Sequence, residues 1–193
     1  MHDLEPYFKW RDHYNSARDK RSPFYGRQYS EFEYSQKIYN YYIHPQWDGF
    51  GSATLYTKII YADYSQGFAV LEFIGEWNDC IQNDIMFLKT KVIDPLINEG
   101  ISKFALICEN ILNFHASDDC YYEEWFEEIA EELGWVCMIN VRQHIEEEMQ
   151  TEGIDRYLVF SPLLEEFNWR RYKPQKLCAK LQEVVDAKYK LLH

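Results

Sequence analysis

An almost uninterrupted apolar run at residues 103–109 (KFALICE) is the feature of this sequence that most restricts its fold. A strand that is exposed on one face alternates apolar and polar side chains, so a continuous apolar run predicts a strand covered on both faces. Residues 120–133 then place apolar side chains on one helical face and glutamates on the other, and Gly134 ends the pattern. Together the two stretches predict a strand, a polar loop and an amphipathic helix within a layered sheet.

Strand and helix patterns alternate along the rest of the chain. Aromatic and β-branched composition predicts further strands at residues 36–43, 53–64, 67–75, 135–141 and 156–160. Helical spacing and capping residues predict helices at residues 4–15, 78–98, 143–151 and 174–191. The polar stretch between residues 16 and 34 has no clean period, and we expect an irregular lead-in there.

The order of these elements defines a fold class. Two strands precede a series in which strands and helices alternate (ββαβαβαβα), which is typical of an α/β protein with a mixed β-sheet and helices packed against it. The length of 193 residues suits one domain. We therefore expect residues 36–193 to form a single α/β domain, preceded by a helical and irregular N-terminal arm at residues 1–35.

The net charge of −12 limits the partners of the chain. Nucleic acids and anionic membranes repel such a surface, so neither is an expected partner. Most of the charge lies in residues 109–166, which contain 16 acidic and 2 basic residues. Segment 9–37 departs from this pattern because its basic residues are interleaved with aromatic ones, a composition that could stack on RNA. An arm that wraps over the domain explains the same composition, and we favour that interpretation.

Five cysteines occur without a CxxC pair, which argues against a disulfide framework and a structural zinc site. Cys108 and Cys137 lie inside apolar runs, where a thiol packs as a small hydrophobic group. The first ten residues are polar and charged, so no signal peptide is expected. No apolar run approaches the ~18 residues of a membrane span. A cytoplasmic location and no cofactor are the resulting expectations.

Side chains that can carry chemistry follow three of the predicted strands, at the ends where α/β proteins usually bind ligands. They are Glu76, Asp79, Asn110, His115, Ser117, Asp118, Asp119, Arg142 and His144. In one interpretation, the carboxylates of Asp79, Asp118 and Asp119 form a divalent-metal or phosphate site of an enzyme. His115 would then transfer protons. In the other interpretation, Asp118 and Asp119 cap the helix that follows them.

A second pair of candidate residues is His144 and Glu148, which stand four residues apart and share one face of the predicted helix. A solvated acidic face explains the same pair. None of the motifs GxSxG, GxxxxGK[ST], GxGxxG and HExxH occurs in the sequence, and neither does an EF-hand loop. The absence of these motifs favours a non-catalytic protein.

Two local stretches, AVLEFIGEW from residue 69 and FALICENILNFHASDD from residue 104, resemble the STAS-type domains of anti-sigma-factor antagonists. The order of elements over about residues 54–150 is also similar to that family. The resemblance implies a regulatory domain in which a serine or threonine between strand and helix is phosphorylated to switch partner binding. Ser117 is the matching residue here, and HASDD stands where the family has an Asp-Ser-Ser-Gly turn.

The leading hypothesis from the sequence is a non-catalytic regulatory or protein-interaction module whose expected partner is another protein. The candidate regulatory or binding loop consists of Glu109, His115, Ser117, Asp118 and Asp119. The candidate partner surface on the following helix consists of Glu124, Glu128 and Glu131. The oligomeric state stays open, and a homodimer is one alternative. The enzyme with a metal or phosphate site is the competing hypothesis.

Overall fold

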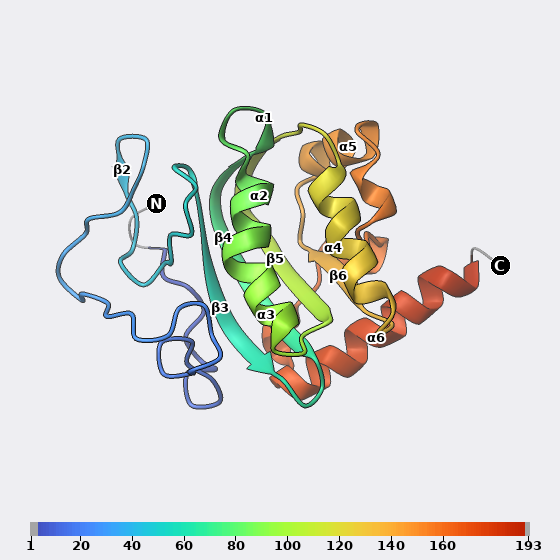
Figure 1. Cartoon of the computed structure of the whole chain (residues 1–193), viewed down its shortest axis with the longest axis horizontal. Coiled ribbons are helices and arrows are strands. Elements are labelled where there is room, and N and C mark those ends of the chain that lie inside the picture. Colours follow the sequence, from blue (N-terminus) through green and yellow to red (C-terminus); the bar gives the residue numbers. More distant parts are fainter. Residues whose placement is uncertain (1–3, 192–193) are drawn as a thin grey trace.

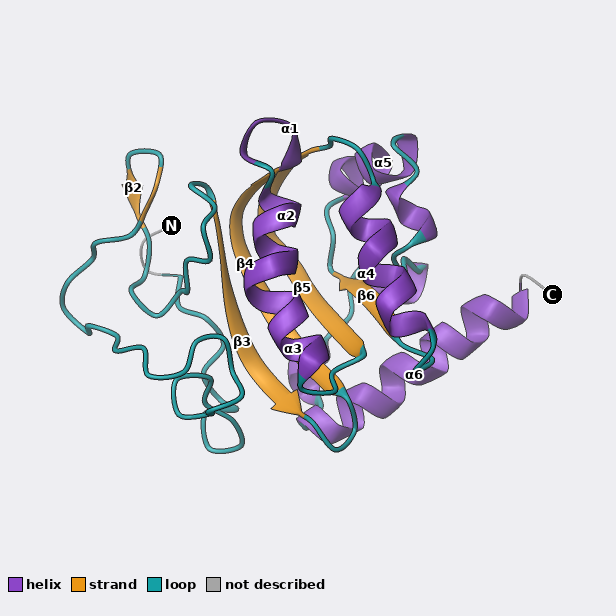
Figure 2. Cartoon of the chain, viewed as in Figure 1, coloured by secondary structure: helices purple, strands orange, loops and turns teal. Residues whose placement is uncertain are grey.

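The computed structural model describes residues 4–191 and contains a twisted four-stranded sheet with helices on both of its sides (Figures 1 and 2). The strands are β3 (Leu55–Asp63), β4 (Phe68–Asn78), β5 (Lys103–His115) and β6 (Trp135–Ile139). They lie in the order β3-β4-β5-β6, with β3 antiparallel to β4 and the other neighbours parallel. The predicted α/β class with a mixed sheet is confirmed.

Helices follow β4, β5 and β6, and a long helix lies at the C-terminal end of the described residues. After β4 come α1 (Asp79–Gln82), α2 (Asp84–Leu88), the π-helical segment η1 (Lys89–Ile93) and α3 (Asp94–Asn98). The others are α4 (Cys120–Ala130), α5 (Gln143–Thr151), α6 (Pro174–Leu191) and the 3-10 turns η2 (Ile154–Arg156), η3 (Pro162–Leu164) and η4 (Trp169–Arg171). The bounds predicted for α5 and α6 are confirmed.

Apolar side chains fill both sides of the sheet. On one side, Leu106 of β5 belongs to a core that includes buried residues of α2, α4 and α5. On the other side, Ile107 packs in a second core with Trp169 and the apolar residues of α6. In Figure 1, α2 and α4 lie in front of the sheet and α6 lies behind it. Successive residues of β5 therefore enter different cores, which explains the continuous apolar run. Cys108 and Cys137 are both buried, as predicted.

β5 extends to His115, six residues beyond the strand predicted at 103–109. Ile111 and Phe114 are buried and keep the strand paired with β4 as far as the Asn78–His115 pair. Asn110 and Asn113, which flank Ile111 and precede Phe114, are half-buried and resemble loop residues in the sequence. The polar connection to α4 is consequently short and consists of residues 116–119.

The strand predicted at 36–43 is in fact a small hairpin of β1 (Lys37–Ile38) and β2 (Tyr41–Tyr42). The chain reverses at Tyr39, whose φ of 53° is in the left-handed region that an extended strand cannot contain. The helix predicted over 78–98 is also interrupted, because Asn83 has a φ of 54° and separates α1 from α2. Backbone reversals at single non-glycine residues leave no clear signal in composition.

Two other predicted elements are wrong. Residues 156–160 form no strand, and only Val159 makes an isolated parallel bridge, to Cys137 of β6. Residues 4–15 form turns in place of a helix. The backbone N–H of Tyr7 donates to the carboxylate of Glu72 in β4 at 2.8 Å. This N–H is therefore bonded to the sheet and not to a carbonyl oxygen within a helix.

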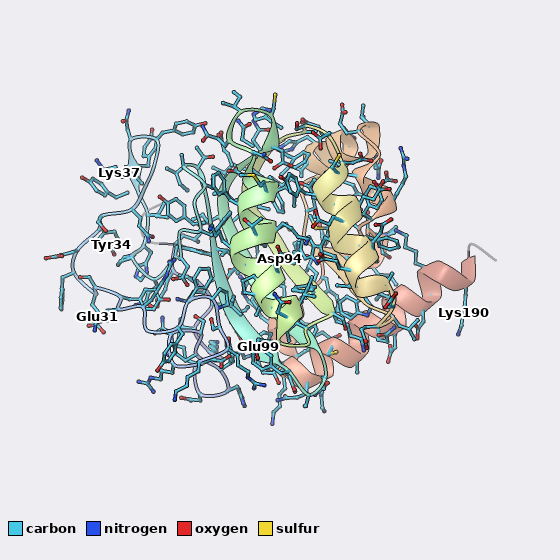
Figure 3. The ribbon with its side chains drawn as sticks, in the orientation of Figure 1. Glu31, Tyr34, Lys37, Asp94, Glu99 and Lys190 are labelled. Carbon is cyan, nitrogen blue, oxygen red and sulfur yellow. The ribbon has the colours of Figure 1, made fainter. Side chains whose placement is uncertain are left out.

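The N-terminal arm and the connection at residues 43–54 that leads into β3 run along the outer edge of β3 and cover it (Figure 2). Asp48 and Thr57 exchange backbone hydrogen bonds of 2.7 and 3.0 Å across that edge. Phe24 is buried in the first core and Trp10 in the second, so the arm contributes to both. Its outermost loop carries Glu31 and other exposed side chains (Figure 3). Covering an edge strand in this way prevents it from pairing with another chain.

Candidate functional site

Asp79, the first residue after β4, is a buried structural group. Its carboxylate accepts hydrogen bonds from the indole N–H of Trp77 at 2.9 Å, the backbone N–H of Ile85 at 2.8 Å and the hydroxyl of Tyr122 at 2.6 Å. Burial raises the pKa of Asp79 to about 6, although these three donors lower it. The carboxylate joins the start of α2 to α4 and faces the core.

Ser117 lies exposed in the connection between β5 and α4, which we call the Ser117 loop (residues 116–119). Three hydrogen bonds restrain this loop through its backbone and its aspartate carboxylates. The N–H of Ala116 donates to Glu148 Oε1 at 3.1 Å, and the N–H of Cys120 donates to Asp118 Oδ1 at 3.2 Å. The Tyr157 hydroxyl donates to Asp119 Oδ2 at 3.1 Å. The serine hydroxyl is thus presented to solvent on a restrained loop at the start of a helix.

The capping interpretation is correct for one of the two aspartates. Asp119 occupies the N-cap position of α4, but its side chain makes no capping hydrogen bond. The carboxylate of Asp118 accepts the first N–H of the helix instead. Both side chains therefore stabilise the connection, one through α4 and the other through Tyr157.

The predicted metal site is not formed. His115 is exposed at the end of β5, where Nε2 lies 3.1 Å from the Asn113 amide nitrogen. Within residues 4–191, no three histidine, cysteine, aspartate or glutamate side chains come close enough together to hold a metal ion. The hypothesis that Asp79, His115, Asp118 and Asp119 jointly bind a divalent cation is therefore wrong, because Asp79 is turned into the core.

The sequence predicted Glu109 in the Ser117 loop, but Glu109 lies inside β5 and contacts Trp169 and Arg170. Its carboxylate is 2.7 Å from the guanidinium of Arg170 and accepts from the indole N–H of Trp169 at 3.1 Å. Glu72 of β4, 2% exposed, lies 3.8 Å from the same guanidinium. The strand extension displaces Glu109 from the Ser117 loop, so the predicted grouping of Glu109 with Ser117 is wrong.

Helix α5 supports the Ser117 loop from the side. His144 Nε2 lies 3.2 Å from the carbonyl oxygen of Leu112, and Glu148 holds Ala116 as described. The sequence places this histidine and glutamate on one helical face, and that face contacts the end of β5 and the loop after it. The supporting contact from Tyr157 has no sequence signal, because the residue lies outside any regular element.

The acidic face of α4, which continues into the turn after the helix, consists of the exposed residues Glu123, Glu124, Glu127, Glu128, Glu131 and Glu132. Two of these glutamates also bind Lys89, whose side chain is 1% exposed. Lys89 Nζ lies 2.7 Å from Glu128, 3.6 Å from Glu124 and 2.5 Å from Asp94. Burial lowers the pKa of Lys89, but the hydrogen bonds to Asp94 and Glu128 outweigh burial and raise it overall. The buried ammonium of Lys89 thus neutralises part of the negative charge of the acidic face.

Replacing Lys89 by methionine is expected to lower the free energy of unfolding by about 1–2 kcal/mol. The loss is smaller than for a fully buried pair because Glu124, Glu128 and Asp94 remain in contact with water. Urea unfolding followed by tryptophan fluorescence measures it, with Glu131→Gln as a surface control expected within about 0.5 kcal/mol of wild type. Equal stability of the Lys89→Met protein would show that the ion pairs contribute nothing.

The chain folds into a mixed four-stranded sheet in which α2 and α4 follow β4 and β5 and cover one face. Solved structures to which this chain is similar include anti-sigma factor antagonists. The phosphorylated form of the Bacillus cell fate determinant SpoIIAA is similar over 54% of this chain and 90% of its own, with 10% identity and a TM-score of 0.40.

Two further solved structures are similar to the same extent. A putative anti-sigma factor antagonist from Thermotoga maritima has 19% identity and a TM-score of 0.39, covering 53% of this chain and 80% of its own. The unphosphorylated anti-sigma factor antagonist SpoIIAA has 13% identity and a TM-score of 0.39, covering 52% and 96%. No protein-family model and no curated protein sequence matches the chain. Among residues 4–191, no helix is long and apolar enough to cross a membrane.

Proposed function

We propose that this chain is a non-catalytic regulatory module that binds another protein through the Ser117 loop and the acidic face of α4. The observation that carries the proposal is the exposed Ser117 hydroxyl on a loop restrained by Glu148, Asp118 and Tyr157. A surface held in one conformation before binding loses little conformational entropy when a partner docks. Restrained exposed loops on a rigid sheet are also where binding residues concentrate.

The charge of the surface indicates the chemistry of the partner. Six exposed glutamates follow the loop within residues 123–132, and Lys89 neutralises only part of their charge from below. A partner with a basic face complements them, since opposite charges accelerate encounter and align the two surfaces. Exposed carboxylates contribute mainly to specificity and association rate, so contacts at the loop supply the remaining affinity.

The regulatory part of the proposal concerns Ser117, the residue that the sequence resemblance matches to the phosphorylated serine or threonine of STAS-type domains. A phosphate adds roughly two negative charges to a loop that already carries Asp118 and Asp119. A partner closing over the loop would have to desolvate this charge. We therefore expect Ser117→Asp to weaken partner binding about tenfold, whereas Ser117→Ala leaves the affinity within about twofold.

Charge reversal on α4 tests the proposal. Glu123, Glu127 and Glu131 are exposed and do not contact Lys89, so reversing all three to lysine spares the ion pairs beneath the helix. The wild-type chain is used to capture a partner, the partner is purified, and its affinity is measured by calorimetry. The triple variant is expected to bind at least about tenfold more weakly.

The matched control reverses three exposed glutamates elsewhere, Glu152, Glu165 and Glu166, with the same change in net charge. Wild-type affinity in this control, together with the loss in the α4 variant, supports the proposal. Equal weakening of partner binding in both variants would mean that the partner is attracted by the net charge of the chain and not by the acidic face of α4, which would contradict the proposed surface. Unchanged binding of the α4 triple variant and of Ser117→Asp would contradict the proposed surface.

A further inference from the structure

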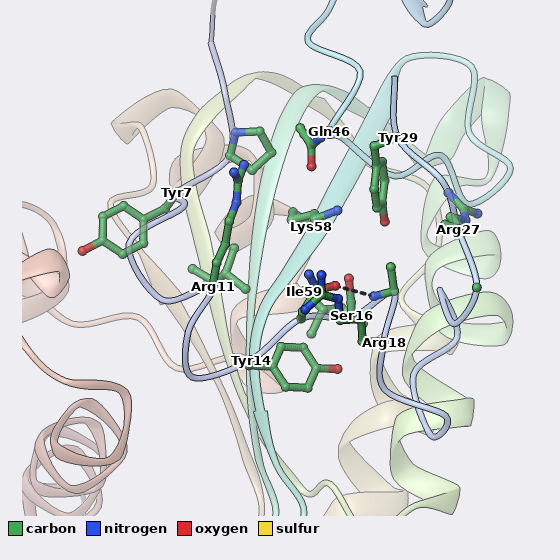
Figure 4. A pocket seen from close by; sticks show the side chains of 15 residues that line it. Tyr7, Arg11, Tyr14, Ser16, Arg18, Arg27, Tyr29, Gln46, Lys58 and Ile59 are labelled. Atoms are coloured by element: carbon green, nitrogen blue, oxygen red, sulfur yellow. Dashed lines mark hydrogen bonds between the residues drawn. The ribbon is translucent and has the colours of Figure 1, made fainter. Parts of the chain in front are cut away.

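We propose that a cavity between the N-terminal arm and β3 binds a small molecule that carries a phosphate group. The cavity has a volume of about 340 Å³. Figure 4 shows it between the arm and the strand, with Arg11 along one wall and Tyr29 along the opposite one. We call it the arm cavity; its lining comes from segments 6–18 and 26–29, from Gln46 and from residues 58–60.

The arm cavity concentrates positive charge in a strongly negative protein. Four cationic side chains line it: Arg11, Arg18, Arg27 and Lys58. Only two carboxylates partner them among the described residues. Asp48 lies 3.1 Å from Arg27 and 3.0 Å from Lys58, and Glu5 pairs with Arg11. Four positive and two negative groups leave a local surplus of two positive charges. Such a surplus attracts an anion although the whole chain carries −12.

Arg18 is the cation best placed to bind an added anion. Within residues 4–191 its guanidinium forms no ion pair, and its side chain lines the cavity. A guanidinium offers a planar fork of donors that matches the oxygens of a phosphate, and charge-assisted hydrogen bonds of this kind are stronger than neutral ones. Arg18 therefore supplies a positive charge and a set of donors that no side chain among residues 4–191 uses.

Lys58 experiences repulsion that an anion would relieve. Its side chain is 14% exposed. Burial lowers the pKa of Lys58, Asp48 raises it, and the neighbouring charges of Arg11 and Arg27 lower it further. The fully buried Asp48 carboxylate is already shared with Arg27 and with the Tyr29 hydroxyl at 2.7 Å. One carboxylate thus offsets two cations, and a bound phosphate would complete the neutralisation.

Ser16 provides an independent indication of a ligand. It is 2% exposed and lines the arm cavity, and its hydroxyl has no hydrogen-bond partner of good geometry among the described residues, although it lies close enough to the Tyr29 hydroxyl to lower the pKa of that group. Buried hydroxyls in folded proteins are nearly always paired, because an unpaired one loses its hydration without compensation. A phosphate oxygen in the cavity would accept this hydroxyl hydrogen.

The walls of the arm cavity indicate the rest of the ligand. The rings of Tyr7, Tyr14 and Tyr29 and the side chain of Ile59 line it beside the cations. Small-molecule sites typically combine apolar walls with a few polar groups in a volume of roughly 300–1,000 Å³. The combination fits a phosphate monoester with a small aromatic or apolar body better than a bare ion.

Calorimetric titration of the full chain with phenyl phosphate, inorganic phosphate and phenol tests the site. We expect saturable one-to-one binding of phenyl phosphate, weaker binding of inorganic phosphate, and no binding of phenol. Arg18→Gln removes one charge-assisted contact and should weaken phenyl phosphate binding about tenfold. Ser16→Ala deletes only the hydroxyl and should weaken it about threefold, which gives a second variant if the first fails to fold.

Arg142→Gln is the matched control, because Arg142 is exposed at the start of α5 and the substitution changes net charge equally. Its affinity should equal that of the wild type. The proposal is overturned by the absence of phenyl phosphate binding at millimolar concentration, or by affinities that Arg18→Gln and Ser16→Ala leave unchanged. Binding of single-stranded RNA without binding of phenyl phosphate would also overturn it. The arm cavity shares no residue with the Ser117 loop or α4, so either proposal can fail alone.

Discussion

Replacing Asp48 by alanine is expected to lower the free energy of unfolding by about 3–5 kcal/mol. The Asp48 side chain is fully buried and accepts from Lys58 at 3.0 Å, Arg27 at 3.1 Å and the Tyr29 hydroxyl at 2.7 Å. Among residues 4–191, Asp48 is the only carboxylate that pairs with the half-buried Lys58 ammonium, and removing one partner of a buried ion pair leaves the other charge uncompensated. The arm should then detach more readily from the edge of β3.

Urea unfolding of wild type and variant measures this loss, and limited proteolysis reports detachment of the arm. The double variant Asp48→Ala/Lys58→Met is the informative control, because it removes both partners and leaves no uncompensated charge at position 58. We expect it to recover part of the stability lost in Asp48→Ala. A loss below about 1 kcal/mol in the single variant would mean that water enters the site and solvates Lys58.

The contacts of Asp48 also show which part of the fold the sequence could not predict. Composition identified basic and aromatic residues in the arm, but Arg27 and Tyr29 of the arm bind Asp48, which lies between the arm and β3. Asp48 in turn binds Lys58 of β3, so its ion-pair partners lie 10 and 21 positions away in the sequence. Such pairing depends on how the arm crosses the edge of the sheet. No local pattern encodes that crossing, so the arm cavity and its cations were not foreseen.

The elements that were predicted correctly have strong local patterns. The apolar run at 103–109 and the helix at 143–151 depend on periodicity over a single element, and both are present with the expected type. The candidate site was less predictable. Exposure of Ser117 follows from a short loop, but the positions of Glu109 and Asp79 depend on strand length and on the direction in which each side chain points.

A pH dependence of stability is the second large expected effect, and it arises from Glu72. This carboxylate is 2% exposed between the N–H of Tyr7 at 2.8 Å and the Arg170 guanidinium at 3.8 Å. Burial raises the pKa of Glu72 from 4.5 to about 7, although Tyr7 and Arg170 lower it and Glu109 adds to the increase. At neutral pH the group is therefore about half protonated, whereas it has lost its proton in the unfolded chain.

The direction of the effect follows from proton binding. Between pH 4.5 and about 7 the folded state binds more protons at Glu72 than the unfolded state, so stability decreases as the pH rises through this range. Each pKa unit corresponds to about 1.4 kcal/mol, so the full decrease amounts to roughly 3 kcal/mol. Asp79, with its pKa raised to about 6, adds a decrease of the same sign at lower pH.

Glu72→Gln should remove the contribution of Glu72 while keeping an acceptor for the N–H of Tyr7. Near pH 4.5 or below, where both side chains are uncharged, the two proteins should unfold at similar urea concentrations. Near pH 8 the variant should be more stable by up to about 3 kcal/mol. Glu131→Gln, on the exposed acidic face, should follow the wild type throughout. Parallel pH profiles for wild type and Glu72→Gln would mean that Arg170 compensates the Glu72 charge completely, so that burial of this carboxylate has no net cost.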